Sequence, residues 1–306
     1  MRLRMIGVCL SLLAGSCLPA LAKCDNASCV RIGSYNIKLF GNDGELATGA
    51  GRIDELATRI DETLDMDVVV LEEINVASES WKALRKNLEG RGYRIAIEGA
   101  FGGENPQRQQ HVVIAHREAI VQQTATPVEV PIATTYDDGK GCSYASVRPP
   151  VVAFFKEGKF DFAVIGAHLK SMSPVDGSAE SCDDDIRRDQ AEKIIEWIGS
   201  QAGAERDFLI VGDLNSGFEE QEFDPFRSAG FATAMVDLPP WSGTASYLPG
   251  GGELIDHVLY APDTSEFLSG SGLVFKLSKS EKKTYLGTQS DHVPIIADFT
   301  TSKDDD

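Results

Sequence analysis

Two short polar segments, each beside an apolar run, constrain the fold of this chain more than any other feature. Gly212-Asp213-Leu214-Asn215 directly follows Phe208-Leu209-Ile210-Val211, and Ser290-Asp291-His292 comes just before Ile295-Ile296-Ala297. Apolar runs of this length are typical of buried strands, and open α/β sheets gather their sites at strand ends. The two segments therefore predict an α/β fold with one shared pocket. A carboxylate beside an imidazole is suited to metal-assisted hydrolysis.

The rest of the chain consists mainly of short apolar runs and two amphipathic segments. Apolar residues share one helical face within 53–64 and within 191–198, which predicts two helices. No Pro/Gly/Ser-rich linker is long enough to separate two domains, so one domain is expected. Strands outnumber helices, which favours sheets packed between helices. The expected strands are Val30 to Ile37, Asp67 to Leu71, Val112 to Ala115, Ser146 to Phe155, Phe160 to Gly166, Phe208 to Val211, Val258 to Tyr260 and Pro294 to Phe299.

The first 22 residues have the three-part pattern of a secretory signal. Arg2 and Arg4 precede an apolar stretch, and small residues lead up to Ala22-Lys23, where we expect cleavage. The stretch is too short for a comfortable membrane span, so an uncleaved anchor is the weaker alternative, as is a lipoprotein attached through Cys17. We therefore expect a signal peptide at 1–22, a single domain at 23–306, and a secreted or periplasmic protein.

Removing the signal deletes two of the six cysteines and leaves Cys24, Cys29, Cys142 and Cys182. An exported protein is in a compartment that permits disulfides, and four free thiols are the alternative. Three pairings are possible. We favour the local pair Cys24 with Cys29, which leaves Cys142 with Cys182 to join two long loops. No Cys-x-x-Cys or Cys/His zinc spacing appears, so a thiolate metal site is not expected.

The chain is strongly acidic, with 29 basic residues, 47 acidic residues and a formal net charge of -18. Such a chain repels polyanions at long range. Tight non-specific binding to nucleic acid or anionic lipid would therefore need local basic patches, bound cations, or both. The charge argues against a scaffold that coats DNA, but not against an enzyme that contacts DNA briefly.

Five further segments place a polar residue beside an apolar strand. With the two opening segments they form an ordered series that resembles the endonuclease/exonuclease/phosphatase superfamily of metal-dependent phosphodiesterases, from Arg31 to Phe299. The resemblance implies a four-layer α/β/β/α sandwich in which two packed, mostly antiparallel sheets are flanked by helices. The five segments are Ser34-Tyr35-Asn36-Ile37, Val70-Leu71-Glu72-Glu73-Ile74, Ser146-Val147-Arg148-Pro149-Pro150, Ala167-His168-Leu169-Lys170-Ser171 and Leu254-Ile255-Asp256-His257-Val258.

The resemblance also implies a cation site. Glu73 would be the principal ligand, with Asn36 and Asp291 nearby. Oxygen ligands of this kind suit Mg²⁺, Mn²⁺ or Ca²⁺ better than zinc. We therefore expect Mg²⁺ as the cofactor, with Mn²⁺ or Ca²⁺ as alternatives.

The same resemblance assigns the chemistry of hydrolysis. His292 would be the general base for in-line water attack, and Asp256 would orient its ring. His168 would act as an acid or a phosphate ligand. Asp213 and Asn215 would hold the scissile phosphate, the nucleophile or a second cation.

Arg148 precedes Pro149-Pro150, as in the Arg-x-Pro segment of pancreatic-type deoxyribonucleases, so it would contact phosphate. A salt bridge to one of the many carboxylates is the alternative role.

The segment after Asn36 favours the deoxyribonuclease I-like branch, because Lys38 is basic where abasic-site nucleases have an acidic residue. Two departures leave the substrate open. Glu72 replaces the usual glutamine, and Gln110 stands where the deoxyribonuclease has a second catalytic glutamate. The other three histidines, for which the sequence suggests no partner, are expected to be structural: His111, His116 and His257.

The leading hypothesis is a secreted, metal-dependent nuclease that hydrolyses DNA, with RNA as an alternative nucleic acid substrate. One alternative keeps the chemistry but acts on a phospholipid or a small phosphate ester, and only Leu238-Pro239-Pro240-Trp241 hints at the apolar hairpin of a membrane-acting enzyme. A catalytically inactive binding protein with the same fold is the second alternative. Nucleic acid is the expected partner, without a stable membrane span or an obligate protein partner.

Overall fold

The computed structural model describes residues 28–42, 46, 49–99, 109–123, 128–173, 182–201 and 207–303. The predicted signal peptide, its cleavage point and Cys24 lie outside these residues. Within the described part of the chain, no helix combines the length and the apolar character needed to cross a membrane.

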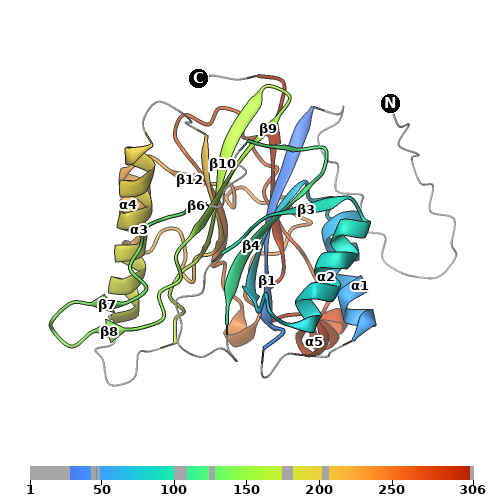
Figure 1. Cartoon of the computed structure of the whole chain (residues 1–306), viewed down its shortest axis with the longest axis horizontal. Helices are drawn as coiled ribbons and strands as arrows, with labels where there is room; N and C mark the ends of the chain where they lie inside the picture. The colour runs from blue at the N-terminus through green and yellow to red at the C-terminus, as the bar shows by residue number, and fades with distance from the viewer. Residues whose placement is uncertain are drawn as a thin grey trace, which may run out of the picture.

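Two β-sheets form the centre of the molecule (Figure 1). The strands of the first sheet are, in spatial order, β14 Leu273–Val274, β15 Ile295–Thr300, β1 Cys29–Phe40, β2 Val68–Ile74, β4 His111–Arg117 and β3 Tyr93–Glu98. Those of the second sheet are β12 Ala232–Thr233, β13 Asp256–Tyr260, β11 Phe208–Asp213, β10 Phe160–His168, β9 Val151–Glu157 and β5 Val121–Gln122, and β6 Val128–Glu129 also pairs with β9. A small separate hairpin pairs β7 Tyr136–Asp137 with β8 Ser143–Tyr144.

Helices cover the outer faces of both sheets (Figure 1). On the side of the first sheet lie α1 Ala50–Thr58, which continues into a π-helical turn at Arg59–Thr63, and α2 Glu79–Gly90. On the side of the second sheet lie α3 Cys182–Ser200 and α4 Asp224–Ser228, while α5 Lys279–Thr288 lies at the end of the molecule where β1 ends. Short 3₁₀ turns span Gln221–Phe223 and Pro249–Gly251. The predicted four-layer arrangement is therefore confirmed.

Alternation along the strands explains the layers. In the second sheet, Val164 and Val211 pack into the core between the two sheets. Their chain neighbours Ile165 and Ile210 point the other way and pack with Ile194 of α3. Successive side chains of a strand point to opposite faces, so a continuous apolar run buries both faces of its sheet.

One parallel strand pair lies in each sheet. β1 pairs in parallel with β2, and β10 pairs in parallel with β11, while every other strand pairing among the described residues is antiparallel. The prediction of mostly antiparallel sheets is confirmed. Each parallel pair brings two carboxyl ends to the same edge, so polar residues that follow these strands come together.

The expected strand Ser146 to Phe155 begins too early. The observed strand β9 begins at Val151, directly after Pro149-Pro150, and proline has no N–H to donate to a strand partner. Sequence analysis also did not predict α2, α5 or β3. The helix α2 has a recognisable start, since the Ser78 side chain accepts a hydrogen bond from the Trp81 backbone N–H at 3.1 Å.

The disulfide between Cys142 and Cys182 is present, as predicted. Cys142 directly precedes β8, and Cys182 is the first residue of α3. Close by, the ammonium of Lys170 lies 3.1 Å from the carboxylate of Asp183 in the first turn of α3. The disulfide and this ion pair therefore attach the β7–β8 hairpin and the end of β10 to one helix.

Candidate active site

A cavity of about 550 Å³ contains most of the predicted site. It lies where β1, β2, β10 and β11 end. Two of the nine predicted residues, Asn36 and Asp256, lie just behind the wall and bond to residues that line it. The other seven line the cavity: Glu73, Arg148, His168, Asp213, Asn215, Asp291 and His292. The structure thus brings all nine predicted residues together.

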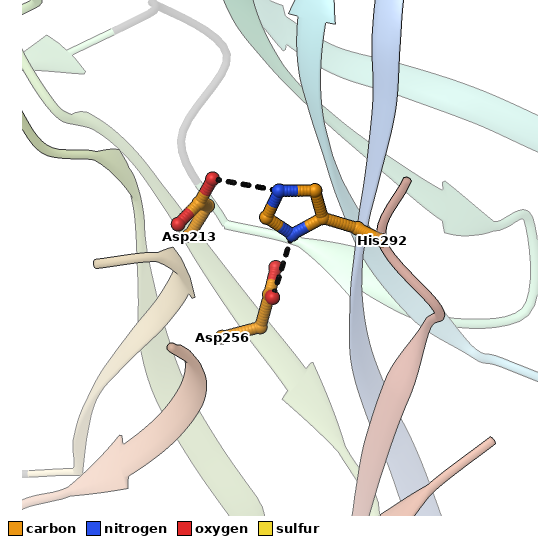
Figure 2. A group of neighbouring side chains, drawn as sticks. All are labelled: Asp213, Asp256 and His292. Atoms are coloured by element: carbon orange, nitrogen blue, oxygen red, sulfur yellow. Dashed lines mark hydrogen bonds and ion pairs between the residues drawn. The ribbon is translucent and has the colours of Figure 1, made fainter. Parts of the chain in front are cut away.

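His292 lies between two carboxylates (Figure 2). Its Nδ1 is 2.8 Å from Asp256 Oδ2, and its Nε2 is 3.6 Å from Asp213 Oδ2. Burial opposes a charge on the ring, but Asp256 and Asp213 outweigh it and raise the pKa of His292 to about 10. Without a bound cation, the imidazole therefore carries a proton at neutral pH.

Asp213 is the most connected carboxylate of the site. Its Oδ2 accepts a hydrogen bond from Asn36 Nδ2 at 2.9 Å, and its Oδ1 accepts one from the Asn215 backbone N–H at 2.9 Å. Burial raises the pKa of Asp213 to about 7, although the charge on His292 opposes this rise. Asp213 and His292 therefore titrate as a coupled pair.

The close approach of the strands at Asp213 requires a glycine before it. Gly212 has φ 147°, and a Cβ there would lie 1.9 Å from the backbone oxygen of Ala167. Glycine avoids both the clash and the unfavourable backbone angle. This residue therefore allows β10 and β11 to bring His168 opposite Asp213 in register.

His168 differs sharply from His292. Burial, with the charges of Arg148 and His292, holds the pKa of His168 well below its usual range. Its Nε2 lies 3.7 Å from Asp213, and its Nδ1 has no hydrogen-bond partner among the described residues. A neutral ring cannot release a proton as an imidazolium does, so of the two predicted roles the surroundings favour that of a phosphate ligand.

Arg148 donates hydrogen bonds to carbonyl and amide oxygens of the protein rather than forming a salt bridge with a carboxylate. Its Nε donates to the His168 carbonyl at 3.0 Å, Nη2 to the Leu169 carbonyl at 2.6 Å and Nη1 to Gln110 Oε1 at 2.7 Å. These bonds use three of the five N–H groups of a guanidinium and leave two that could face phosphate. Gln110 thus supports Arg148, whereas the glutamate at its position in the deoxyribonuclease would support the histidine.

The predicted cation ligands meet at the ends of β1 and β2. Asn36 Nδ2 donates to Glu73 Oε1 at 3.3 Å, and the Glu73 Oε2 accepts from the Leu39 backbone N–H at 2.8 Å. The Oδ1 of Asn36 is buried without a hydrogen-bond partner among the described residues. An unpaired buried oxygen beside a carboxylate matches the oxygen-only coordination of Mg²⁺ or Ca²⁺, so the donors fit a hard divalent cation.

Asp291 contributes to the same side of the cavity but already has a cationic partner. Lys38 donates to its Oδ2 at 2.6 Å, and the Lys38 side chain is 37% exposed, so this ammonium can move away. A second arrangement also has metal-binding geometry, because Asp213, Asp256 and His292 can place one ligand atom each within 4.8 Å of one another. The 2.8 Å Asp256–His292 bond engages two of these groups, so the prediction of Asn36, Glu73 and Asp291 as cation ligands is kept.

Three residues that line the cavity have left-handed backbone conformations. Leu39 has φ 50°, Glu73 has φ 63° and Asn215 has φ 56°. Non-glycine residues in this region cost of order 1 kcal/mol each and cluster at functional sites. The side chains of Glu73 and Asn215 line the cavity where β2 and β11 end.

Several contributors were not assigned a role from the sequence. Ser290 Oγ donates to the Asn36 carbonyl at 2.7 Å and accepts from the His292 backbone N–H at 3.1 Å, so it fixes the catalytic segment to β1. Its place directly before Asp291-His292 was a signal for such a role. Tyr247 also lines the cavity, with its ring centroid 5.0 Å from that of His292.

Glu72 is fully buried behind the site. Its Oε1 accepts from Ser34 Oγ at 2.8 Å, whereas its Oε2 has no partner among the described residues. Burial, reinforced by the charge of Asp256, raises its pKa well above the usual range. A protonated carboxyl has one donor and acceptor capacity, much like the glutamine usual at this position.

The remaining histidines do not line the cavity, and each has a partner that the sequence did not indicate. His257 Nε2 is 3.0 Å from the Ser216 carbonyl, and His116 Nδ1 is 2.9 Å from the Arg117 carbonyl. His111 also has a partner and, like the other two, is buried. Burial lowers the pKa of all three, which suits neutral structural side chains.

Comparisons with known proteins identify the family to which the chain belongs. The chain is similar to the Bos taurus protein named endonuclease/exonuclease/phosphatase family domain-containing protein 1, with 22% identity over 188 aligned residues. The aligned region covers 59% of this chain and 33% of that protein. The chain thus spans about a third of the length of this relative.

Solved structures match over nearly the whole chain. An endonuclease/exonuclease/phosphatase from Bacteroides vulgatus has a TM-score of 0.63 and 18% identity, covering 89% of this chain and 98% of that one. A mannosyl-6-phosphatase from Bacteroides thetaiotaomicron has a TM-score of 0.58 and 16% identity, covering 88% and 98%. The family model described as "Endonuclease/Exonuclease/phosphatase family" matches residues 33–292. The chain therefore belongs to the endonuclease/exonuclease/phosphatase family, whose members are hydrolases that act on phosphate esters.

Proposed function

We propose that this protein is a secreted, metal-dependent phosphodiesterase that hydrolyses DNA by in-line attack of water. One observation carries the proposal: His292 lies between Asp256 and Asp213 on one side of the cavity, and the oxygen cluster of Asn36 and Glu73 lies beside Asp213. Proton transfer and charge stabilisation are thereby available within one cavity of about 550 Å³.

In the proposed reaction, His292 accepts the proton of the attacking water at Nε2. Asp256 bonds to Nδ1 and so fixes the ring orientation and stabilises the imidazolium that forms. The raised pKa of His292 means that it must first lose a proton, and positive charge near Asp213 would favour that loss.

Asn36, Glu73 and Asp291 would hold the divalent cation, with Mg²⁺ preferred and Mn²⁺ or Ca²⁺ possible. When bound, it would supply Lewis-acid activation and offset the charge that develops on the phosphate oxygens. Lys38 would then be released from Asp291 and become available to the substrate.

The second sheet would hold the scissile phosphate. The Nε2 side of neutral His168, the Asn215 amide and the remaining N–H groups of Arg148 border the cavity together. Hydrogen-bond donors placed before the reaction stabilise charge in a transition state without reorganisation. Asp213 would orient Asn36, Asn215 and His292 at once.

DNA is preferred over the alternatives for specific reasons. Lys38 at the cavity supports the deoxyribonuclease I-like assignment. For a membrane-acting enzyme, the segment 238–241 would have to project apolar residues, but Leu238 packs against the core, which leaves Pro240 and Trp241 as its exposed residues. A small phosphate ester is the second candidate, because a structural neighbour is a mannosyl-6-phosphatase. An inactive binding protein is disfavoured because all nine residues converge.

Export is part of the proposal. The signal-like pattern at 1–22 and the disulfide between Cys142 and Cys182 both suit an oxidising compartment, either periplasmic or extracellular. The proposed partner is the nucleic acid substrate, and no obligate protein partner is invoked.

The test is to incubate the purified mature protein with supercoiled plasmid, RNA, sphingomyelin and bis(p-nitrophenyl) phosphate, each with Mg²⁺ and with chelator. We expect chelator-sensitive plasmid nicking that is lost in His292→Ala, which also controls for contaminating nuclease. Glu79→Ala, on an exposed position of α2, should behave like the wild type. Activity confined to lipid or to small esters would reject DNA as the substrate.

A further inference from the structure

A cluster of lysines on and before α5 stands out in this acidic protein. Within residues 276–283 the sequence has four lysines and one glutamate, whereas the whole chain has a net charge of -18. The glutamate, Glu281, accepts the Ser278 backbone N–H at 2.8 Å as part of the helix cap. The exposed charge of this segment is therefore mainly positive.

The helix directs these lysines to one face. Lys279, Lys282 and Lys283 are separated by three and four residues, and such residues are neighbours on a helix surface. Lys282 Nζ donates to the Leu248 carbonyl at 3.0 Å, and the Leu248 backbone N–H donates to the Asp291 carbonyl at 2.8 Å. Since Asp291 lines the cavity, the lysine face reaches the rim of the candidate active site.

An exposed aromatic side chain lies at the other end of this face. Lys276 Nζ is 3.4 Å from the Pro240 carbonyl, and the next residue, Trp241, is 51% exposed. The lysine surface is defined here as Trp241, Lys276, Lys279, Lys282 and Lys283. It combines ammonium groups with an indole, which is the combination that binds single-stranded nucleic acid.

We propose that the lysine surface binds the backbone of a nucleic acid strand next to the cavity, with Trp241 stacked on a base. This inference rests on the proposed nuclease function and names the surface that the substrate uses. An acidic enzyme repels a polyanion at long range, so a local basic surface beside the cavity is needed to hold the strand. The same surface accounts for how a chain of net charge -18 could engage DNA at all.

The experiment compares two triple variants with the same change in charge. The test variant is K276E/K279E/K283E, which leaves the bond from Lys282 to Leu248 intact. The matched control is K156E/K159E/K303E, whose lysines lie at the opposite end of the molecule, near the β9–β10 turn and the last described residues (Figure 1). A general effect of net charge would weaken both variants equally.

Binding of a fluorescent single-stranded 20-mer is measured by anisotropy in chelator, so that no hydrolysis occurs, over a range of NaCl concentrations. We expect affinity to fall at least about tenfold in the test variant only, with the slope of log affinity against log salt reduced by about 2. Trp241→Ala should weaken binding roughly tenfold with little change in the salt slope. Hydrolysis of bis(p-nitrophenyl) phosphate should be unchanged in all these variants.

Equal binding by the test and control variants would overturn the inference, as would binding of the wild type to phosphatidylserine vesicles in preference to the oligonucleotide. These outcomes are separate from those for the proposed function. If DNA is cut but the lysine surface has no effect, only this inference fails. If the lysine surface binds the strand but no nucleic acid is hydrolysed, only the proposed function fails.

Discussion

The two sheets contribute different chemistry to the candidate site. The first sheet supplies all three proposed cation ligands: Asn36 from β1, Glu73 from β2 and Asp291 from the segment before β15. The second sheet supplies the residues proposed to hold phosphate and to orient the base, from around β9, β10, β11 and β13: Arg148, His168, Asp213, Asn215 and Asp256. His292 and Asn36 come from the side of the first sheet and bond to carboxylates of the second, His292 to Asp256 and Asn36 to Asp213.

The two halves also differ in which polar atoms they leave unpaired. In the first sheet, Asn36 keeps a buried oxygen without a partner among the described residues, and Glu73 has a left-handed backbone. In the second sheet, both oxygens of Asp213 have polar neighbours and Arg148 makes three bonds to protein oxygens, although His168 Nδ1 and Asp256 Oδ1 lack partners among the described residues. The free amide oxygen of the first half suits a bound cation, and the bonds of the second half suit fixed positioning. Metal dependence and pH dependence should therefore respond to variants in different sheets.

His292→Ala should have the largest effect, because His292 joins the two halves. We expect kcat for bis(p-nitrophenyl) phosphate to fall about 10³-fold at saturating Mg²⁺, which is typical for loss of a general base. Mn²⁺ binding, followed by calorimetry, should change little, because the proposed ligands remain. Activity within tenfold of the wild type would show that another group accepts the proton.

Asp256→Asn should affect proton transfer at His292 and leave cation binding unchanged. The change preserves size but removes the charge that raises the pKa of His292, so that pKa should fall toward its usual range. We expect roughly a 10²-fold loss of kcat because the ring loses its orienting carboxylate. NMR titration of the metal-free protein would report the pKa, with exposed Asp263→Asn as the control. An unchanged titration of His292 would contradict the assigned role of Asp256.

Glu73→Gln should affect cation binding and leave proton transfer at His292 unchanged. We expect the Mg²⁺ concentration for half-maximal activity to rise at least about tenfold, while the pH dependence at saturating Mg²⁺ keeps its shape. The control is Glu79→Gln, whose side chain is 89% exposed. If the pH profile moves and the Mg²⁺ requirement does not, the division between the two sheets is wrong.

The smallest expected effect is on stability. The folded-state pKa values of Asp213 and His292, about 7 and about 10, both lie above their unfolded values of about 4 and 6.5. Between about pH 4 and about pH 10, the folded protein therefore binds more protons than the unfolded chain. Its stability consequently falls as pH rises through this range. In chelator, Tm should fall by roughly 5 °C from pH 5 to pH 9, and less steeply in His292→Gln. A Tm that rises over this range would contradict the assigned shifts.

Much of the site could be predicted from the sequence because its residues lie next to apolar runs. Asp213 and His168 end their strands as expected, and Asn36 lies in β1. The order of these segments along the chain carries the resemblance to the family, and that resemblance implied the sandwich. A short apolar run bounded by Gly or Pro indicates a strand from the local sequence alone, without knowledge of the rest of the fold.

The missing parts depend on tertiary contacts. The three bonds of Arg148 lead to backbone carbonyls and to Gln110, and no spacing in the sequence indicates them. The contrast between His168 and His292 arises from burial and from which charges lie nearby, which only the folded chain determines. The helix α5 was missed because only Tyr285 among its residues is buried, so its sequence has little apolar periodicity.

The pairing of β15 with β1 joins two strands that are more than 250 residues apart in the chain. Asn36 and Glu73 are therefore synthesised more than 200 residues before Asp291 and His292. A nascent chain cannot assemble the proposed catalytic centre until the segment with His292 has left the ribosome. If the protein cuts nucleic acid as proposed, this order of assembly would keep the shorter nascent chain harmless to the cell that produces it.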